Sequence, residues 1–341
     1  MTRSTDIEGP PLIYIRVWGN SRCRDVLIGA VCVALLVLSL PLVALAQPID
    51  SIIPPDPGYP DGVSPTHVYA KIDLLDRSLD RLLEARNVTV PSYPRQIESE
   101  LRPMHVYQAV LKCAWRLQEL DDQLGVATVP TLTLKPRVYY PRDVYFIVNL
   151  MLENVRRIAE HEGITDLSRE ETPVSGKEPT DVYNRAVKVF VKLGALAGYS
   201  DLSPSEVFAE MVRGAEDVRS ILRQADPASR YRIDIPATEP DRQPGHVFAK
   251  CLEIRTKINA LRLALNLKPI PVPDALLLNQ IQPRDVFFQT QIIIAELNLL
   301  KKPLDTVSST PLPIPVTSKT PTDVHEKATM ILYLLEQVKA K

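Results

Sequence analysis

The chain has little glycine, little cysteine and almost no net charge. Its 341 residues include 12 Gly against 31 Pro and 4 Cys, and the formal net charge is −1 at pH 7. The near-zero net charge argues against a nucleic-acid partner, because neutralising phosphates requires a basic surface. Many prolines with few glycines exclude flexible Gly-rich linkers and indicate stiff connectors and sharp helix starts. An apolar fraction of 45% still permits a globular core.

The sequence also lacks the short motifs that mark common enzymes. It contains no G-x-S-x-G, no H-E-x-x-H, no P-loop and no C-x-x-C-H haem-attachment motif. We therefore predict a protein that is not an enzyme and that carries no cofactor.

Residues 1–46 have the pattern of a secretory signal peptide. Arginines precede an apolar run at residues 26–40, Pro41 interrupts that run, and Ala44–Leu45–Ala46 provides a small-residue cleavage site. The alternative is an uncleaved signal anchor at residues 26–46, which is long enough to cross a bilayer of about 30 Å. The predicted location is the periplasm or the exterior after cleavage, or the membrane if the segment stays. Membrane contact is expected only through this segment, and only if it stays uncleaved.

Residues 47–63 are polar and Pro-rich and predict a flexible tether. Beyond them the chain keeps two cysteines, Cys113 and Cys251. In an oxidising compartment these could form a disulfide. Because both fall on the apolar stripe described below, we expect buried core thiols instead.

A short proline–valine motif recurs along the rest of the chain. It reads Pro, any residue, an acid or His, Val, and then an aromatic residue or His, as in Pro65–Tyr69. The motif prolines are Pro65, Pro103, Pro141, Pro179, Pro204, Pro244, Pro283 and Pro321. Their successive differences are 38, 38, 38, 25, 40, 39 and 38, a repeat period with one short step. The short step divides the array into duplicated units at residues 64–200 and 201–341.

Each motif predicts a helix start. Proline suits the first helical position, N1, because its missing N–H would have no partner there. The acid or His at N3 can accept from the backbone N–H of the N-cap residue, and an acid also complements the positive helix end. From the motif valine, apolar residues recur in steps of four and three, as in Val68, Ile72, Leu75, Leu79 and Leu82. The predicted fold is all-α, with eight long helices.

The connectors predict the topology. Each helix of about 20 residues is about 30 Å long, and the roughly 15 Pro-rich residues that follow can span about 45 Å when extended. We expect each connector to return along its helix, so that the helices of a four-helix unit run parallel. The short junction before Ser203 predicts that the second unit runs antiparallel to the first. An open α-solenoid, in which each helix contacts its sequence neighbours, is the alternative.

The N3 residues are candidate metal ligands as well as caps. His and carboxylate side chains gathered at one end of a bundle could bind Zn²⁺ or another divalent ion. These residues are His67, His105, Asp143, Asp181, Glu206, His246, Asp285 and Asp323. Capping is the favoured interpretation, because N3 lies beside the apolar stripe and not on it.

The aromatic residues of the motif are candidates for partner or ligand binding. They are Tyr69, Tyr107, Tyr145, Tyr183, Phe208, Phe248 and Phe287, with His325 in the last copy. Packing against the incoming connector is the favoured interpretation. Taken together, the sequence predicts an exported, non-enzymatic helical-repeat protein that binds or scaffolds a protein partner at the cell envelope. A periplasmic module that binds a small molecule or metal at the helix N-terminal ends is the alternative.

Overall fold

The computed structural model describes residues 58–59, 61–126, 130–225, 227, 239–274 and 278–339. The predicted signal peptide or anchor lies outside these residues, as does most of the predicted tether. The chain divides into a unit of residues 1–50 and a unit of residues 51–341, and the second unit holds every helix described here. None of these helices is long and apolar enough to cross a membrane.

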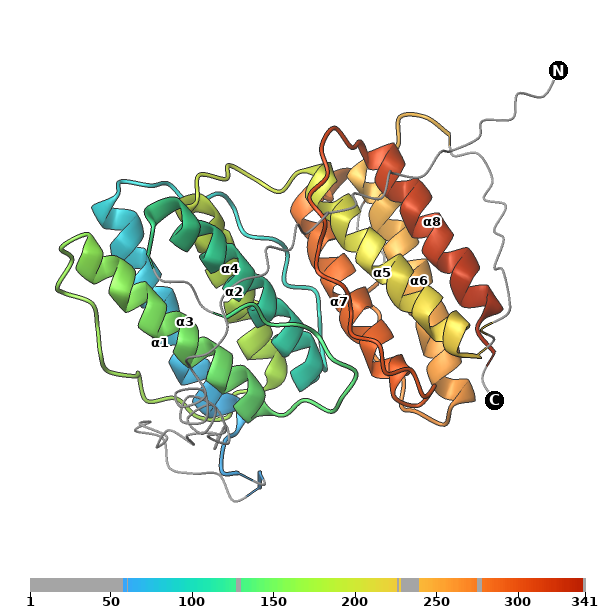
Figure 1. Ribbon diagram of the computed structural model, residues 1–341, viewed down its shortest axis with the longest axis horizontal. Coiled ribbons are helices and arrows are strands. Elements are labelled where there is room, and N and C mark those ends of the chain that lie inside the picture. The colour runs from blue at the N-terminus through green and yellow to red at the C-terminus, as the bar shows by residue number, and fades with distance from the viewer. Residues whose placement is uncertain are drawn as a thin grey trace, which may run out of the picture. The chain divides into compact units, whose positions relative to one another are not determined.

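The described chain is all-α, as predicted, and contains eight α-helices and one short 3-10 helix, η1 (Figure 1). In chain order they are α1 (Pro65–Ala85), α2 (Pro103–Leu124), α3 (Pro141–His161), α4 (Pro179–Leu196), α5 (Pro204–Ala225), α6 (Pro244–Ala264), η1 (Leu278–Gln280), α7 (Pro283–Lys301) and α8 (Pro321–Gln337). Every motif proline is the first residue of its helix. Among the described residues, the one β-type pairing is an isolated antiparallel bridge between Leu134 and Thr310.

The helices form two four-helix bundles, α1–α4 and α5–α8. In the first bundle α1 packs on α3 and α4, and α2 packs on the same two helices. The second bundle repeats this arrangement, with α5 and α6 each packed on α7 and α8. Among the described residues, the pairs α1–α2, α3–α4, α5–α6 and α7–α8 make no contact and lie diagonally across their bundles, whereas α2 packs on α3 and α6 on α7. The open α-solenoid alternative is wrong, because it requires contact between all sequence neighbours.

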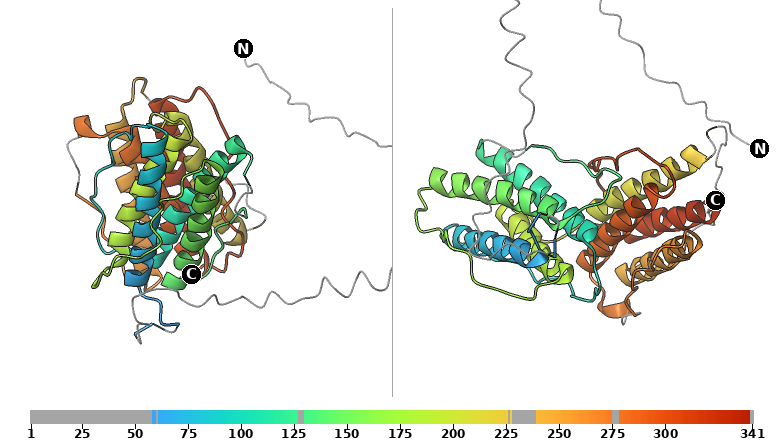
Figure 2. Two further views of the ribbon diagram at one scale, coloured as in Figure 1. Left: turned by 90° about the vertical axis from the view of Figure 1, so that its left-hand side faces the viewer. Right: turned by 90° about the horizontal axis from the view of Figure 1, so that it is seen from below.

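The helices of the first bundle run parallel, as the connector lengths predict. The first turns of α1, α2, α3 and α4 meet around one shared hollow. The connector between α7 and α8 returns along the outside of the helices (Figures 1 and 2). Antiparallel bundles are also confirmed: Lys112 and Arg116 follow each other along α2, while their partners Glu210 and Glu206 run backwards along α5.

The predicted apolar stripe forms the core. Its members on every helix are buried, from Val68 at the start of α1 to Val338 after α8. Cys113 and Cys251 are both free and fully buried, which confirms their prediction as core thiols. Burial raises the pKa of Cys251 to about 12, so this thiol stays protonated at neutral pH.

Candidate functional site at the helix N-terminal ends

Each N3 side chain accepts a hydrogen bond from the backbone N–H of its own N-cap residue. For example, Ser64 N donates to His67 Nδ1 at 3.1 Å, and Thr320 N donates to Asp323 Oδ2 at 2.8 Å. The equivalent bonds are made by His105, Asp143, Asp181, Glu206, His246 and Asp285. Capping is therefore found in every copy of the motif, including those whose N-cap residue is not Ser or Thr.

A histidine can cap in this way in its neutral form, because Nδ1 must carry a free lone pair. His105 is fully buried, and Arg102 N donates to its Nδ1 at 3.0 Å. Burial, with Arg255 and Arg102 nearby, lowers the pKa of His105 to about 3. At this position the motif thus uses a neutral His as its cap.

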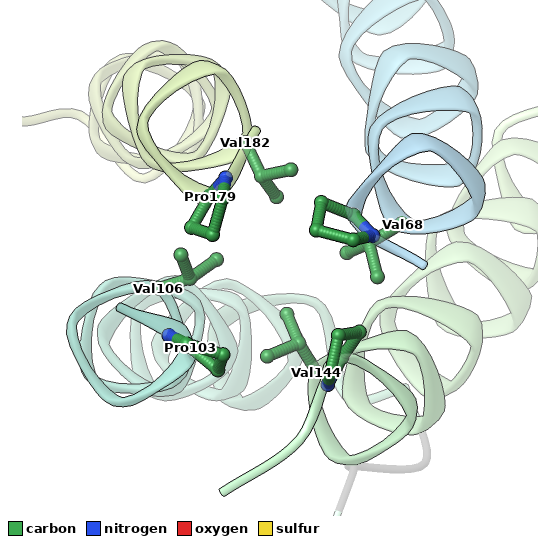
Figure 3. Close-up of a pocket in the computed structure, with 8 residues that line it drawn as sticks. Val68, Pro103, Val106, Val144, Pro179 and Val182 are labelled. Carbon is green, nitrogen blue, oxygen red and sulfur yellow. The ribbon is translucent and has the colours of Figure 1, made fainter. Parts of the chain in front are cut away.

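The structure gives the metal prediction no support. In the part of the chain that it describes, no three His, Cys, Asp or Glu side chains come together in a way that could hold a metal ion. The N3 side chains turn toward their own N-caps, and the residues that converge at the end of the first bundle are prolines and valines. This hollow is shown in Figure 3 and has a cavity volume of about 10 Å³. Its lining residues are Pro65, Val68, Pro103, Val106, Pro141, Val144, Pro179 and Val182.

Most of the motif aromatics pack inside the protein. Tyr107, Tyr145, Tyr183, Phe248 and Phe287 are buried. The Tyr107 ring lies 4.0 Å from that of Tyr139, centroid to centroid, in the connector before α3. The Phe287 ring stacks 5.3 Å from Phe190 of α4. These contacts favour the packing interpretation over a shared binding face.

Tyr69 and Phe208 are half-buried, and each is covered by two cations. Lys177 and Arg185 lie over the Tyr69 ring, at 4.6 and 5.2 Å from its centroid. Lys319 and Lys327 lie over the Phe208 ring at 4.7 and 5.5 Å. The two sets occupy equivalent motif positions. Lys177 and Lys319 each precede their motif valine by five residues, and Arg185 and Lys327 each follow it by three. The duplication seen in sequence therefore extends to side-chain contacts.

The N2 residues join neighbouring helix starts, a role that the sequence analysis missed. Lys177 N donates to Thr66 Oγ1 at 3.1 Å, and Leu101 N donates to Thr180 Oγ1 at 3.1 Å. In the second bundle, Lys319 N donates to Ser205 Oγ and Arg242 N to Thr322 Oγ1. The signal was present in the sequence as a hydroxyl at N2 in the first and fourth copies of each unit.

The two bundles meet through polar contacts and stacked aromatic rings. The connector at residues 86–102, between α1 and α2, lies against α6, α7 and η1: Arg95 N donates to Asp285 at 3.0 Å, and Arg95 Nη2 to Gln280 at 2.9 Å. Further along α2, Arg116 pairs with Glu206 of α5 at 2.7 Å. The interface also contains the stacked rings of Phe190 and Phe287, so it combines apolar packing with ion pairs.

Exposed apolar residues flank, along the chain, the bridge at which two connectors pair. Thr310 N donates to Leu134 O at 2.9 Å, which aligns the α7–α8 connector antiparallel to the α2–α3 connector. Within four residues of Thr310 along the chain, two large apolar side chains are strongly exposed, Val307 at 85% and Ile314 at 68%. Val138 and Leu312 add to the group at 47% and 43%. We call these four residues the connector crossing.

No family model, no curated protein and no solved structure matches this chain. Its function is therefore inferred from the contacts and exposure of its own residues.

Proposed function

We propose that the protein is a non-enzymatic binding or scaffolding module at the cell envelope, with the connector crossing as its partner surface. The supporting observation is the exposure of Val307 and Ile314 beside the bridge between Leu134 and Thr310. Apolar side chains on a backbone fixed at both ends by helices offer a preorganised surface, which lowers the entropic cost of binding. The motif residues supply the rigid frame through their caps and packing.

The location of the partner follows from the N-terminal pattern. A chain exported by a signal peptide, or held by an anchor, presents its helical part outside the cytoplasm. The partner we expect is a protein whose contacting surface is apolar, because the exposed crossing residues carry no charge.

The test is site-specific photo-crosslinking in an envelope extract of the source organism. A photo-reactive residue at position 307 or 314 should form the same protein adduct, and one at Leu263, an apolar residue of α6 that is 60% exposed, should not. A V307K/I314K variant with an unchanged melting temperature should lose the complex with the identified partner. Equal adducts from all three positions, or a complex that survives the double variant, would contradict the proposal.

A further inference from the structure

Three buried charged groups link the first bundle to the second. Arg255 of α6 lies between Glu98, on the 86–102 connector of the first bundle, and Glu296 of α7. Arg255 Nη1 donates to both oxygens of Glu98 at 2.9 and 3.0 Å, and Arg255 Nε donates to Glu296 Oε1 at 3.1 Å. The side chains of Arg255, Glu98 and Glu296 are 0%, 5% and 1% exposed. Two carboxylates thus share one guanidinium away from water.

The hydrogen bonds are divided unequally between the two carboxylates. Glu98 accepts from Arg255 with both oxygens and also from Gln289 Nε2. Glu296 accepts through Oε1, while its Oε2 is buried without a hydrogen-bond partner among the described residues. A buried carboxylate oxygen with no donor is costly, and a neutral carboxylic acid costs less to bury. Glu296 is therefore the group of this pair that takes up a proton.

We propose that Glu98, Arg255 and Glu296 form a proton-operated latch that holds the 86–102 connector of the first bundle against α6 and α7 of the second. With a proton on Glu296, the cluster contains one carboxylate for one guanidinium. When that proton leaves, the buried cluster carries an excess negative charge. Acidification tightens the latch, and a rise in pH loosens it.

The charged surroundings of Glu296 agree with this assignment. On α6, Arg255 and Arg262 both face it, and Glu98 faces it from the connector before α2. His105 of α2 faces the same two arginines and stays neutral. On α5, Asp217 pairs with Lys301 and Arg213 pairs with Glu210. Burial raises the pKa of Glu296 to about 7; Arg255 opposes this rise and Glu98 adds to it.

The sign of the pH effect follows from proton linkage. The pKa of Glu296 is about 7 in the folded protein against an ordinary value of 4.5. Between these values the closed latch binds more protons than the open one, so opening becomes more favourable as pH rises. The opening constant should rise by up to about tenfold per pH unit between these two values and level off above pH 7.

Amide hydrogen exchange on the full chain tests the latch. Protection factors for residues 92–102, corrected for intrinsic exchange, should fall from pH 5 to pH 7 in the wild type and stay constant in Glu296→Gln. Glu100→Gln is the matched control, since Glu100 lies on the same connector but pairs at the surface with Lys268. It should keep the wild-type pH profile. The same pH profile in wild type and Glu296→Gln would overturn the proposal.

Carbon-13 NMR of the glutamate carboxyl groups provides a second measurement that needs no substitution at Glu296. One carboxyl of the wild type, that of Glu296, should titrate near pH 7. Its midpoint should fall in Glu98→Gln, because Glu296 is then the one carboxylate of the latch paired with Arg255. If every glutamate carboxyl of the wild type titrates below pH 5.5, the latch does not exist.

Discussion

Lys112 Nζ of α2 lies 2.8 Å from Glu210 Oε1 of α5, and both side chains are buried where the two bundles meet. Glu210 also pairs with Arg213 of its own helix, whose side chain is 1% exposed. One carboxylate therefore neutralises two buried cations. Burial would raise the pKa of Glu210, but Arg213 and Lys112 outweigh this effect and hold the pKa at about 2. The carboxylate is thus the member of this group whose loss should cost most.

We expect Glu210→Gln to lower the free energy of unfolding by about 3–5 kcal/mol, because it leaves Lys112 and Arg213 buried without a counter-charge. Lys112→Met should cost less, about 1–2 kcal/mol, since Glu210 keeps Arg213 and the methionine retains the packing on Trp115. Urea unfolding at pH 7 measures both values. Equal costs for the two substitutions would show that the carboxylate does not serve both cations.

The fold was largely predictable because the sequence features that specify it act locally. Proline at N1, a cap at N3 and apolar steps of four and three each act within one helix, so they can be recognised without knowing any contact between helices. The parallel direction also followed, since a connector of known length limits where the next helix can begin. The diagonal placement of α1 and α2 was not predicted, because connector length does not decide which neighbour a parallel helix packs on.

His105 should make the protein sensitive to acid. Its pKa is about 3 in the folded protein against an ordinary 6.5, so the unfolded chain binds more protons between these values. The contribution of His105 to stability should therefore fall as pH drops from 6.5 toward 3, by up to a few kcal/mol, whereas the contribution of Glu296 has the opposite sign. His105→Asn keeps a capping oxygen but cannot titrate, so its stability relative to the wild type should rise over this range. Chemical unfolding at pH 7, 5.5 and 4 measures the difference.

The control for that experiment is His246→Asn, which alters an equivalent cap on an exposed side chain. It should retain the acid sensitivity of the wild type. If His105→Asn and wild type lose stability in parallel, the buried histidine is not the source of the pH dependence.

The N2 hydroxyls allow the two bundles to be compared through the stability that each hydroxyl contributes. Thr180 accepts from Leu101 N at 3.1 Å and Thr322 accepts from Arg242 N at 3.2 Å, at equivalent places in the two bundles. Replacing either by valine leaves a backbone N–H without its acceptor and should cost about 1 kcal/mol. Thermal unfolding should give similar losses for Thr180→Val and Thr322→Val. A loss in one variant alone would mean that the bundles share geometry but not energetics.

The polar residues between the bundles could not be predicted from the sequence. Glu98, Arg255 and Glu296 have no fixed spacing, and they meet because the connector of one bundle lies on the helices of the other. Taken singly, Glu98 belongs to a polar connector and Arg255 to a helix of mixed charge. The caps, in contrast, were predictable, because the N-cap N–H is the nearest partner for any N3 acceptor.

Gly214 tests how closely the helices of the second bundle pack. A Cβ built on it would lie 3.3 Å from Ile331 Cδ1 of α8 and 3.8 Å from Leu297 Cδ1 of α7. Alanine favours a helix interior over glycine by about 1 kcal/mol, but here the close contact opposes that gain, and overpacking typically costs about 1–3 kcal/mol. We expect Gly214→Ala to destabilise the protein by about 1 kcal/mol in urea unfolding.

Gly194 of α4 is the matched control, because its Cβ would meet its nearest neighbour, Tyr199 Cβ, at an ordinary 3.9 Å. Gly194→Ala should stabilise the protein by about 0.5–1 kcal/mol. Adding Ile331→Val to Gly214→Ala removes the methyl group that the new Cβ contacts, so the double variant should cost less than the two single losses together. Additive costs would show that α5 and α8 can separate to accept the methyl group, and that glycine is not required at this crossing.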